Sequence, residues 1–216
     1  MSKEILITKR DGRKEPLELD KLHKVVFHAC ENITGVSESE VEIKSHIQFY
    51  TGITSAEIQE TLIKSAADLI TEETPNYQFV AGRLINYHLR KEVYGTFTPP
   101  CLCDIIQDNI DAGFYDSEFT ELYTKDEIND LNNHIKHERD EVLTYAAMEQ
   151  FRGKYLVQNR ASGEIFETPQ VAYMMIAATL FAKYPAETRM QYVKAYYDAI
   201  STFKISLPTP VMAGVR

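Results

Sequence analysis

The sequence has few cysteines, no tryptophan and no long hydrophobic run. None of its three cysteines, Cys30, Cys101 and Cys103, belongs to a CxxC pair, which argues against a zinc ribbon or a thioredoxin-like motif. An odd number without secretory spacing fits a reducing compartment, and we interpret the CxC pair as packing residues. The longest apolar stretch, Val171 to Ala182, is too short to cross a bilayer, and the charged N-terminus does not resemble a signal peptide. We therefore expect a cytoplasmic protein that does not enter membranes.

Positive charge is also scarce, except at one end. Lys and Arg number 23 against 32 Asp and Glu, a net charge of -9, which argues against a nucleic-acid-binding protein because that function needs a basic surface. Residues 1–24 nevertheless carry a net charge of +2. A local basic cluster on an acidic protein suits a small anion better than a long polyanion.

The first part of the chain predicts a β-hairpin followed by four helices. A short apolar run at residues 5–7 and an alternating segment at residues 17–19 flank Asp11-Gly12, the strongest signal for a two-residue turn. Helical spacing follows over residues 21–32, 39–50, 55–71 and 76–94, and Thr54 with Glu57 forms a capping box before the third helix. Gly95 and the prolines after it indicate a domain boundary. We expect a first domain at residues 1–95.

The rest of the chain predicts a second, mainly helical region, so the fold class is mainly α (α+β). Helices are expected over residues 100–112, 125–139, 143–151, 168–184 and 186–202, with a small hairpin at 154–167. Residues 203–216 resemble a strand that enters something larger. His134 and His137 lie three residues apart on a predicted helix, but no third ligand stands nearby, so we expect a solvated helix face and no metal site.

Cations gather around the predicted turn. Lys9 and Arg10 precede it and Arg13-Lys14 follow it, and such like charges repel unless water or an anion separates them. One interpretation is a solvated hairpin tip that prevents edge-to-edge pairing. The other is an anion site, which Lys21 favours because it stands in the first turn of the next helix, where the dipole attracts phosphate. The order of elements allows Lys91, late on the fourth helix, to approach as well.

Three segments give the chain a resemblance to a known family. They are ILITKRDGRKEPLELDKLHKVV, SHIQFYTGITSAEIQETLIKSAADLI and PNYQFVAGRLINYHLRKEVYG, and they resemble the ATP-cone domain of class I ribonucleotide reductase large subunits. The resemblance continues through HERD, GKYLVQNRASGEIFETPQ and STFKISLPTPVMAGVR. It implies an ATP-cone at 1–95, a helical domain at 96–202 and, at 203–216, the start of a ten-stranded catalytic barrel.

The resemblance also implies a site for ATP or dATP, with Mg²⁺, as an allosteric effector. Cationic side chains would face the triphosphate: Lys9, Arg10, Lys21 and Lys91. Apolar side chains would pack near the adenine: Ile7, Leu22 and Phe49. Polar side chains would contact the nucleoside and ribose: Glu15, Glu18, Ser55 and Gln59. Bacterial relatives often have asparagine at position 18 and histidine at position 59. Because ATP and dATP differ only in the 2′-hydroxyl, we hypothesise that this cone responds weakly to dATP.

The expected role of the chain is that of one component of an enzyme. Thr209 matches a threonine that contacts the substrate phosphate in the family, although Pro-Thr-Pro also suits a simple turn. None of the three cysteines matches a catalytic cysteine, so no catalytic residue is expected here. The implied partners are the remainder of the large subunit, a radical-generating small subunit, and thioredoxin or glutaredoxin. Alternatives are a stand-alone nucleotide-sensing adaptor and, disfavoured by the lack of CxxC, an ATP-cone transcriptional regulator.

Overall fold

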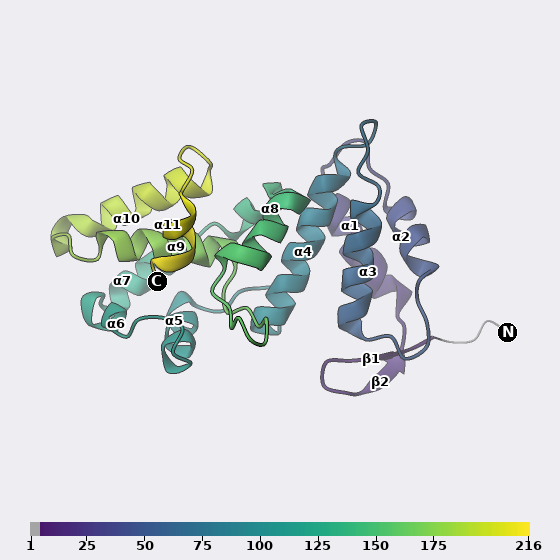
Figure 1. The fold of residues 1–216 in the computed structure, drawn as a ribbon, viewed down its shortest axis with the longest axis horizontal. Helices are drawn as coiled ribbons and strands as arrows, with labels where there is room; N and C mark the ends of the chain where they lie inside the picture. Colours follow the sequence, from purple (N-terminus) through teal and green to yellow (C-terminus); the bar gives the residue numbers. More distant parts are fainter. Residues whose placement is uncertain (1–4) are drawn as a thin grey trace. The chain divides into compact units, whose positions relative to one another are not determined.

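The computed structural model describes residues 5–216, and these residues are mostly helical with one small N-terminal sheet (Figure 1). They form two compact units, one made of residues 5–88 and 141–149, the other of residues 89–140 and 150–216. This confirms the mainly helical fold class. The expected domain limits (1–95, 96–202 and 203–216) stay predictions.

The N-terminal hairpin has a longer turn than the sequence suggested. β1 (Leu6–Thr8) pairs antiparallel with β2 (Lys14–Pro16), and the Lys9 N–H donates to the Arg13 carbonyl at 2.8 Å. Three residues, 10–12, therefore form the loop, and Gly12 has a φ of +82°. The expectation of a two-residue turn is wrong because a glycine in the left-handed region at the third loop position suits the three-residue turn with a bulge.

Four helices follow in the first unit, although the last of them continues into the second. They are α1 (Leu19–Cys30), α2 (Glu38–His46), α3 (Ser55–Ala67) and α4 (Tyr77–Tyr94). The capping box before α3 is confirmed, since Thr54 and Glu57 exchange both hydrogen bonds. The core consists of apolar side chains from α1, α3 and α4 that are fully buried: Val26, Ala29, Leu62, Ala66, Val80 and Leu84.

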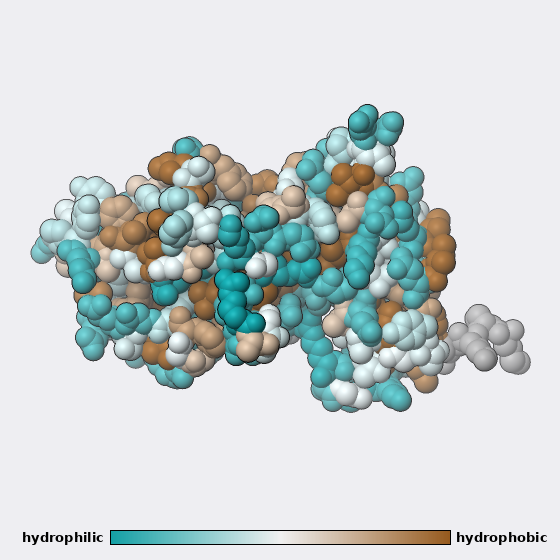
Figure 2. Space-filling view, in the orientation of Figure 1, coloured by the Kyte–Doolittle hydropathy of each residue, from teal (hydrophilic) through white to brown (hydrophobic). Residues whose placement is uncertain are grey.

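Helix α2 is shorter and more exposed than its apolar residues predicted. It ends at His46, four residues before the expected end. Val41 is buried, but Ile43 is 64% exposed and Ile47 81% exposed. Figure 2 shows hydrophobic residues on the surface where Figure 1 has α2. Regular spacing thus identified the helix, but the part of its apolar face beyond Val41 is left in solvent.

The segment 141–149 joins the first unit through contacts with α4. A Cβ atom added to Gly82 would lie 2.1 Å from the carbonyl oxygen of Leu143, so the two backbones touch there. Arg83 donates from Nε to the Glu141 carbonyl at 3.2 Å and from Nη1 to the Glu31 carbonyl at 2.6 Å. Glycine at position 82 therefore permits the close approach, and Arg83 connects this segment with the end of α1.

The second unit consists of helices and short irregular segments. Its helices are α5 (Leu102–Asp111), α6 (Glu118–Leu122), α7 (Lys125–His134), α9 (Pro169–Phe181), α10 (Ala186–Ser201) and α11 (Thr209–Gly214), and α8 (Tyr145–Gln150) leads into it. A 3₁₀ turn spans His137–Val142 and a π-helical turn spans Phe151–Tyr155. Helix α9 is buried from Pro169 to Ala178 and packs against α10. No helix among the described residues is long and apolar enough to span a membrane.

Two expected β elements differ from the prediction. The second hairpin is reduced to an isolated bridge between Gln158 and Ile165, because residues 151–155 form a π-helical turn instead of a strand. The strand expected within 203–216, as the start of a barrel, is absent from the described residues. Residues Thr209–Gly214 form α11 instead. Pro210 suits the first turn of a helix, and a lone strand would leave its backbone groups unpaired.

Candidate functional site

The N-terminus of α3 lies directly beside strand β1. The Thr8 N–H donates to the Ile53 carbonyl at 2.9 Å, and the Gly52 N–H donates to the Leu6 carbonyl at 2.7 Å. Thr8 also forms an isolated parallel bridge with Thr54. These bonds place Ser55, the first residue of α3, next to the hairpin. Backbone N–H groups at a helix N-terminus favour anions, so this junction suits a phosphate.

Charges of both signs alternate along the hairpin and the start of α1. Lys9 Nζ lies 2.8 Å from Glu15 Oε1, and Lys21 Nζ lies 2.7 Å from Glu18 Oε1. The hydrogen bond from Lys9 lowers the pKa of Glu15 below its usual value, and the charges of Lys21 and Arg13 lower it further. Because Glu15 interacts electrostatically with both lysines, the four side chains form one charge cluster. We call it the hairpin cluster (Lys9, Glu15, Glu18 and Lys21).

The hairpin cluster can exchange partners easily. The side chains of Lys21 and Glu18 are 65% and 52% exposed, and ion pairs in solvent contribute little net stability. The hydrogen bond with Glu18 raises the pKa of Lys21, and the charge of Glu15 adds to the shift. Lys21 therefore stays protonated at neutral pH. A strongly charged anion can replace the carboxylates at small cost.

The cations at the hairpin tip behave differently from the hairpin cluster. Arg13 Nε lies 2.7 Å from Asp11 Oδ2, and both side chains are more than half exposed. That hydrogen bond raises the pKa of Arg13, while the backbone N–H and then the side chain of Arg13 lower the pKa of Asp11. Arg10 is exposed at the first loop position. The four cations expected to stand together are thus divided, because Arg13 is paired within the loop.

The apolar residues of the expected site differ in burial. Ile7 on β1 and Leu22 on α1 are 6% and 5% exposed. Phe49 follows α2 and is half-buried, with its ring 5.4 Å from that of His46. Ile7 and Leu22 hold the hairpin and α1 to the core of the first unit, while Phe49 keeps part of its ring available to a ligand.

Gln59, one turn after Ser55 on α3, carries an unsatisfied polar atom. Its Oε1 is buried and has no hydrogen-bond partner among the described residues. An unpaired buried acceptor costs free energy, and each such atom in a native fold calls for an explanation. A hydroxyl or amine donor from a ligand would satisfy this oxygen.

Two expected site residues lie in the second unit. Lys91 Nζ stands 4.3 Å from the centre of the Phe97 ring and 3.4 Å from the Gly95 carbonyl oxygen. Its approach to the hairpin stays a prediction. Thr209 is the exposed first residue of α11, and its contact with a substrate phosphate also stays a prediction.

The two histidines considered as metal ligands have separate surroundings. His134 Nε2 lies 3.0 Å from Asp198 Oδ2, whereas burial, helped by the charge of Arg90, lowers the pKa of His137 to about 4. No group of three potential metal ligands occurs among the described residues. The simple solvated face expected from the sequence is wrong, because His134 is hydrogen-bonded to Asp198 on α10 and both histidines are half-buried.

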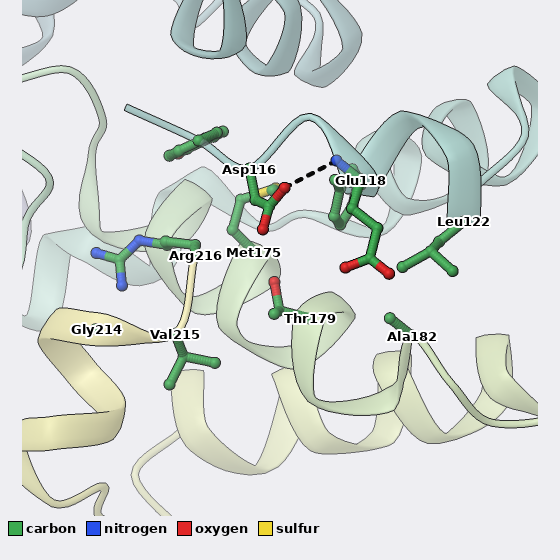
Figure 3. A pocket seen from close by; sticks show the side chains of 11 residues that line it. Asp116, Glu118, Leu122, Met175, Thr179, Ala182, Gly214, Val215 and Arg216 are labelled. Carbon is green, nitrogen blue, oxygen red and sulfur yellow. Dashed lines mark hydrogen bonds between the residues drawn. The ribbon is translucent and has the colours of Figure 1, made fainter. Parts of the chain in front are cut away.

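Figure 3 shows an open pocket of the second unit, between α6, α9 and residues 214–216. Asp116 and Glu118 lie on one side, and Met175 and Thr179 line its floor. Arg216 borders it, but the guanidinium donates to the Glu167 carboxylate at 2.8 and 2.9 Å and is 1% exposed. The one cation that borders the pocket is therefore already neutralised, and we assign no ligand to this pocket.

Sequence reasoning missed a buried polar network in the second unit. Glu167 is fully buried and accepts hydrogen bonds from Tyr115 Oη at 2.5 Å and the Val157 N–H at 2.8 Å, besides Arg216. A second chain of bonds runs from Tyr197 to Gln170 to Asp140. The only hint of this network in the sequence was the presence of polar residues beside the apolar run of α9. The same pattern also fits a surface loop.

The comparisons with known proteins agree with the fold. Residues 5–92 match the family model of the ATP cone domain, and residues 141–216 match that of the ribonucleotide reductase all-alpha domain.

Three relatives, all alpha subunits of ribonucleoside-diphosphate reductase, illustrate the similarity. Subunit alpha of reductase 1 from Escherichia coli is 53% identical over 216 residues, which are 100% of this chain and 28% of the relative. The Haemophilus influenzae protein is 52% identical over 216 residues (100% and 29%), and that of Enterobacteria phage T4 is 41% identical over 214 residues (98% and 28%). The chain thus spans less than a third of the length of these relatives.

Proposed function

We propose that this chain, which carries the ATP-cone and all-alpha domains of ribonucleotide reductase alpha subunits, binds ATP or dATP as an allosteric effector at the hairpin cluster and the N-terminus of α3. The observation that carries the proposal is the alternation of Lys9, Glu15, Lys21 and Glu18 beside a helix N-terminus. A triphosphate, with Mg²⁺, supplies the negative charge that the two lysines now receive from carboxylates.

The exchange of partners explains why both signs of charge are needed. When the triphosphate binds Lys9 and Lys21, the carboxylates of Glu15 and Glu18 lose their cationic partners and become acceptors for hydroxyl and amine donors of the nucleoside. Arg10 and Lys91 add positive charge to the triphosphate side, and the hydroxyl of Ser55 adds a donor at the start of α3. Ile7, Leu22 and Phe49 form the apolar surroundings of the adenine.

Gln59 supplies a basis for distinguishing the ribose from the deoxyribose. Its unpaired Oε1 would accept a hydrogen bond from the 2′-hydroxyl of ATP, and dATP cannot donate that bond. A polar group left unpaired by the wrong ligand is the strongest form of discrimination available to a binding site. We therefore propose that dATP acts weakly here, and strong inhibition of the assembled enzyme by dATP would contradict this.

Calorimetry with MgATP tests the site. Lys21→Ala should weaken binding about tenfold, because it removes one charge-assisted contact to phosphate. Lys64→Ala is the matched control, since Lys64 is an exposed lysine late on α3, and it should bind MgATP like the unmodified chain. If the unmodified chain gives no binding heat, or both variants weaken binding equally, the proposed site is wrong.

The wider role concerns the complete enzyme. We propose that the chain works with the remainder of an alpha subunit and a radical-generating small subunit in reducing ribonucleoside diphosphates, with thioredoxin or glutaredoxin as electron donor in the cytoplasm. Thr209 would contact the substrate phosphate. A pull-down with the missing alpha region, followed by a CDP reduction assay, tests this role. The proposed role is wrong if this chain and the missing alpha region associate and yet no CDP is reduced in the presence of the small subunit.

A further inference from the structure

Two cysteine side chains meet at the start of α5. Cys101 is the N-cap residue of this helix and Cys103 lies in its first turn, and their sulfur atoms are 2.8 Å apart. That distance is shorter than the sum of two sulfur van der Waals radii, and neither thiol is in a disulfide. Both side chains are partly exposed. The interpretation of this pair as packing residues stays a prediction, and the contact between the two sulfur atoms raises a second one.

The backbone around the pair explains why both sulfur atoms lie on one side. Cys101 has φ −59° and ψ 141°, an extended conformation from which the helix then begins. Leu102, between the cysteines, is 1% exposed, and its N–H donates to Asn132 Oδ1 on α7 at 2.8 Å. Anchoring Leu102 inward holds both neighbours on the outer side of the helix N-terminus, so their proximity is fixed by the core of the second unit.

The two thiols are not equivalent. A hydrogen bond with Cys101 raises the pKa of Cys103, and burial and the charge of Asp104 raise it further. Cys103 therefore keeps its proton longer, and we assign the first attack to Cys101, at the N-cap position of α5. Cys30 differs from both, because it is 5% exposed and burial raises its pKa to about 12.

We propose that Cys101 and Cys103 are a reversible dithiol–disulfide site that reacts with small disulfides of the glutathione type. The Cys101 thiolate attacks one sulfur of the small disulfide, which forms a mixed disulfide and releases one thiolate. Cys103 loses its proton to solvent and attacks the Cys101 sulfur, which forms the Cys101–Cys103 bond and releases the second thiol. Two electrons pass from the protein to the small disulfide. An excess of a reduced dithiol returns two electrons by the same kind of exchange, which restores both cysteine thiols and leaves the added dithiol as a disulfide.

The site does not depend on nucleotide binding. The disulfide would enclose a single residue, Leu102, within a tight ring at the helix start. Strained or exposed disulfides are the ones that thiols reduce readily, so the bond serves as a reversible modification and not as a permanent structural link. In the oxidised state, the N-cap and the first turn of α5 are tied to each other covalently.

The test is oxidation of the 216-residue chain with oxidised glutathione, alkylation and mass spectrometry of tryptic peptides. Residues 92–125 form one peptide that contains both cysteines, and Cys30 lies in another, residues 25–44. We expect the first peptide to lose two hydrogen atoms and to escape alkylation, and a reduced dithiol to restore it. The Cys30 peptide should be alkylated only after denaturation.

Variants separate the two roles. Cys103→Ser should trap glutathione on Cys101, because the second attack is missing, and Cys101→Ser should acquire glutathione much more slowly. Helix content by circular dichroism shows whether each variant folds. Stable glutathione adducts on the unmodified chain, disulfide-linked dimers in place of the intramolecular bond, or equal trapping in both variants would overturn the proposal.

Discussion

The hairpin cluster of the first unit and the Glu167 network of the second differ most in the access of their charged side chains to water. In the first unit, the side chains of Lys9 and Glu15 are 30% and 29% exposed, and Lys21 and Glu18 more so. In the second unit, Arg216 and Glu167 are 1% and 0% exposed. Exposed pairs hold each other weakly and can accept another partner. Buried pairs are costly to break, since removing one partner leaves an uncompensated charge. The comparison assigns ligand exchange to the hairpin cluster and structural support to the Glu167 network.

The largest expected effect is that of breaking the buried network. Glu167→Gln leaves the guanidinium of Arg216 without a negative partner in the interior, and should lower the free energy of unfolding by about 3–5 kcal/mol. Urea unfolding measures the loss. Glu164→Gln is the control, because Glu164 is exposed three residues away, and it should leave the midpoint unchanged. Equal midpoints for the two variants would remove the distinction between buried and exposed pairs.

The next effect depends on pH and concerns His137. Its pKa in the folded chain is about 4, because burial and the charge of Arg90 disfavour the imidazolium. An ordinary pKa of about 6.5 in the unfolded chain means that the unfolded state binds more protons between these values. The contribution of neutral His137 to the free energy of unfolding is therefore complete above pH 6.5 and is lost as the pH falls towards 4. The loss in the free energy of unfolding is on the order of 2–3 kcal/mol.

Urea midpoints measured from pH 7 to pH 4 test this dependence. His137→Gln should flatten the decrease, while His23→Gln, at an exposed histidine of the first unit, should leave it as in the unmodified chain. The same slope in all three chains would show that His137 is not the group responsible.

A third effect tests the close contact within the first unit. Gly82→Ala forces the carbonyl of Leu143 away from α4, because the added Cβ would lie 2.1 Å from it. Overpacking of this kind costs about 1–3 kcal/mol. Hydrogen exchange should increase selectively in residues 141–149. Gly153→Ala is the control, since a Cβ there meets no atom within 4 Å, and unchanged exchange in Gly82→Ala would contradict the contact.

Local signals in the sequence predicted local structure well. Thr54 with Glu57 predicted the start of α3, and apolar spacing predicted the other helices of both units except α6 and α11. Contacts between residues far apart in the sequence could not be predicted from such local signals. Nothing near Thr8 indicates its bond to Ile53, and a glycine at position 82 does not reveal which segment approaches it. The C-terminal segment was misjudged because apolar residues between prolines suit a strand, a turn or the first turn of a helix equally.

The candidate site shows the same limit. Charge and position pointed to Lys9 and Lys21, but only the three-dimensional structure shows that carboxylates hold both lysines and that Arg13 is paired with Asp11. The unpaired oxygen of Gln59 is likewise invisible in a sequence, because it depends on what the neighbouring helices fail to provide. Residue type therefore identified the members of the cluster, and three-dimensional pairing determined which of them a ligand must compete for.

The smallest effect on stability is expected within the hairpin cluster, where Glu15→Gln removes the partner of Lys9. Because this pair is open to solvent, the unfolding midpoint should stay the same. The affinities for two ligands should, however, change in opposite directions. Inorganic tripolyphosphate should bind more tightly, since Lys9 no longer has to leave a carboxylate, whereas MgATP should bind more weakly, since the nucleoside loses an acceptor. Calorimetry with both ligands measures this. A change of the same sign for both would mean that Glu15 does not contact the nucleoside, and that the hairpin cluster recognises only the phosphates.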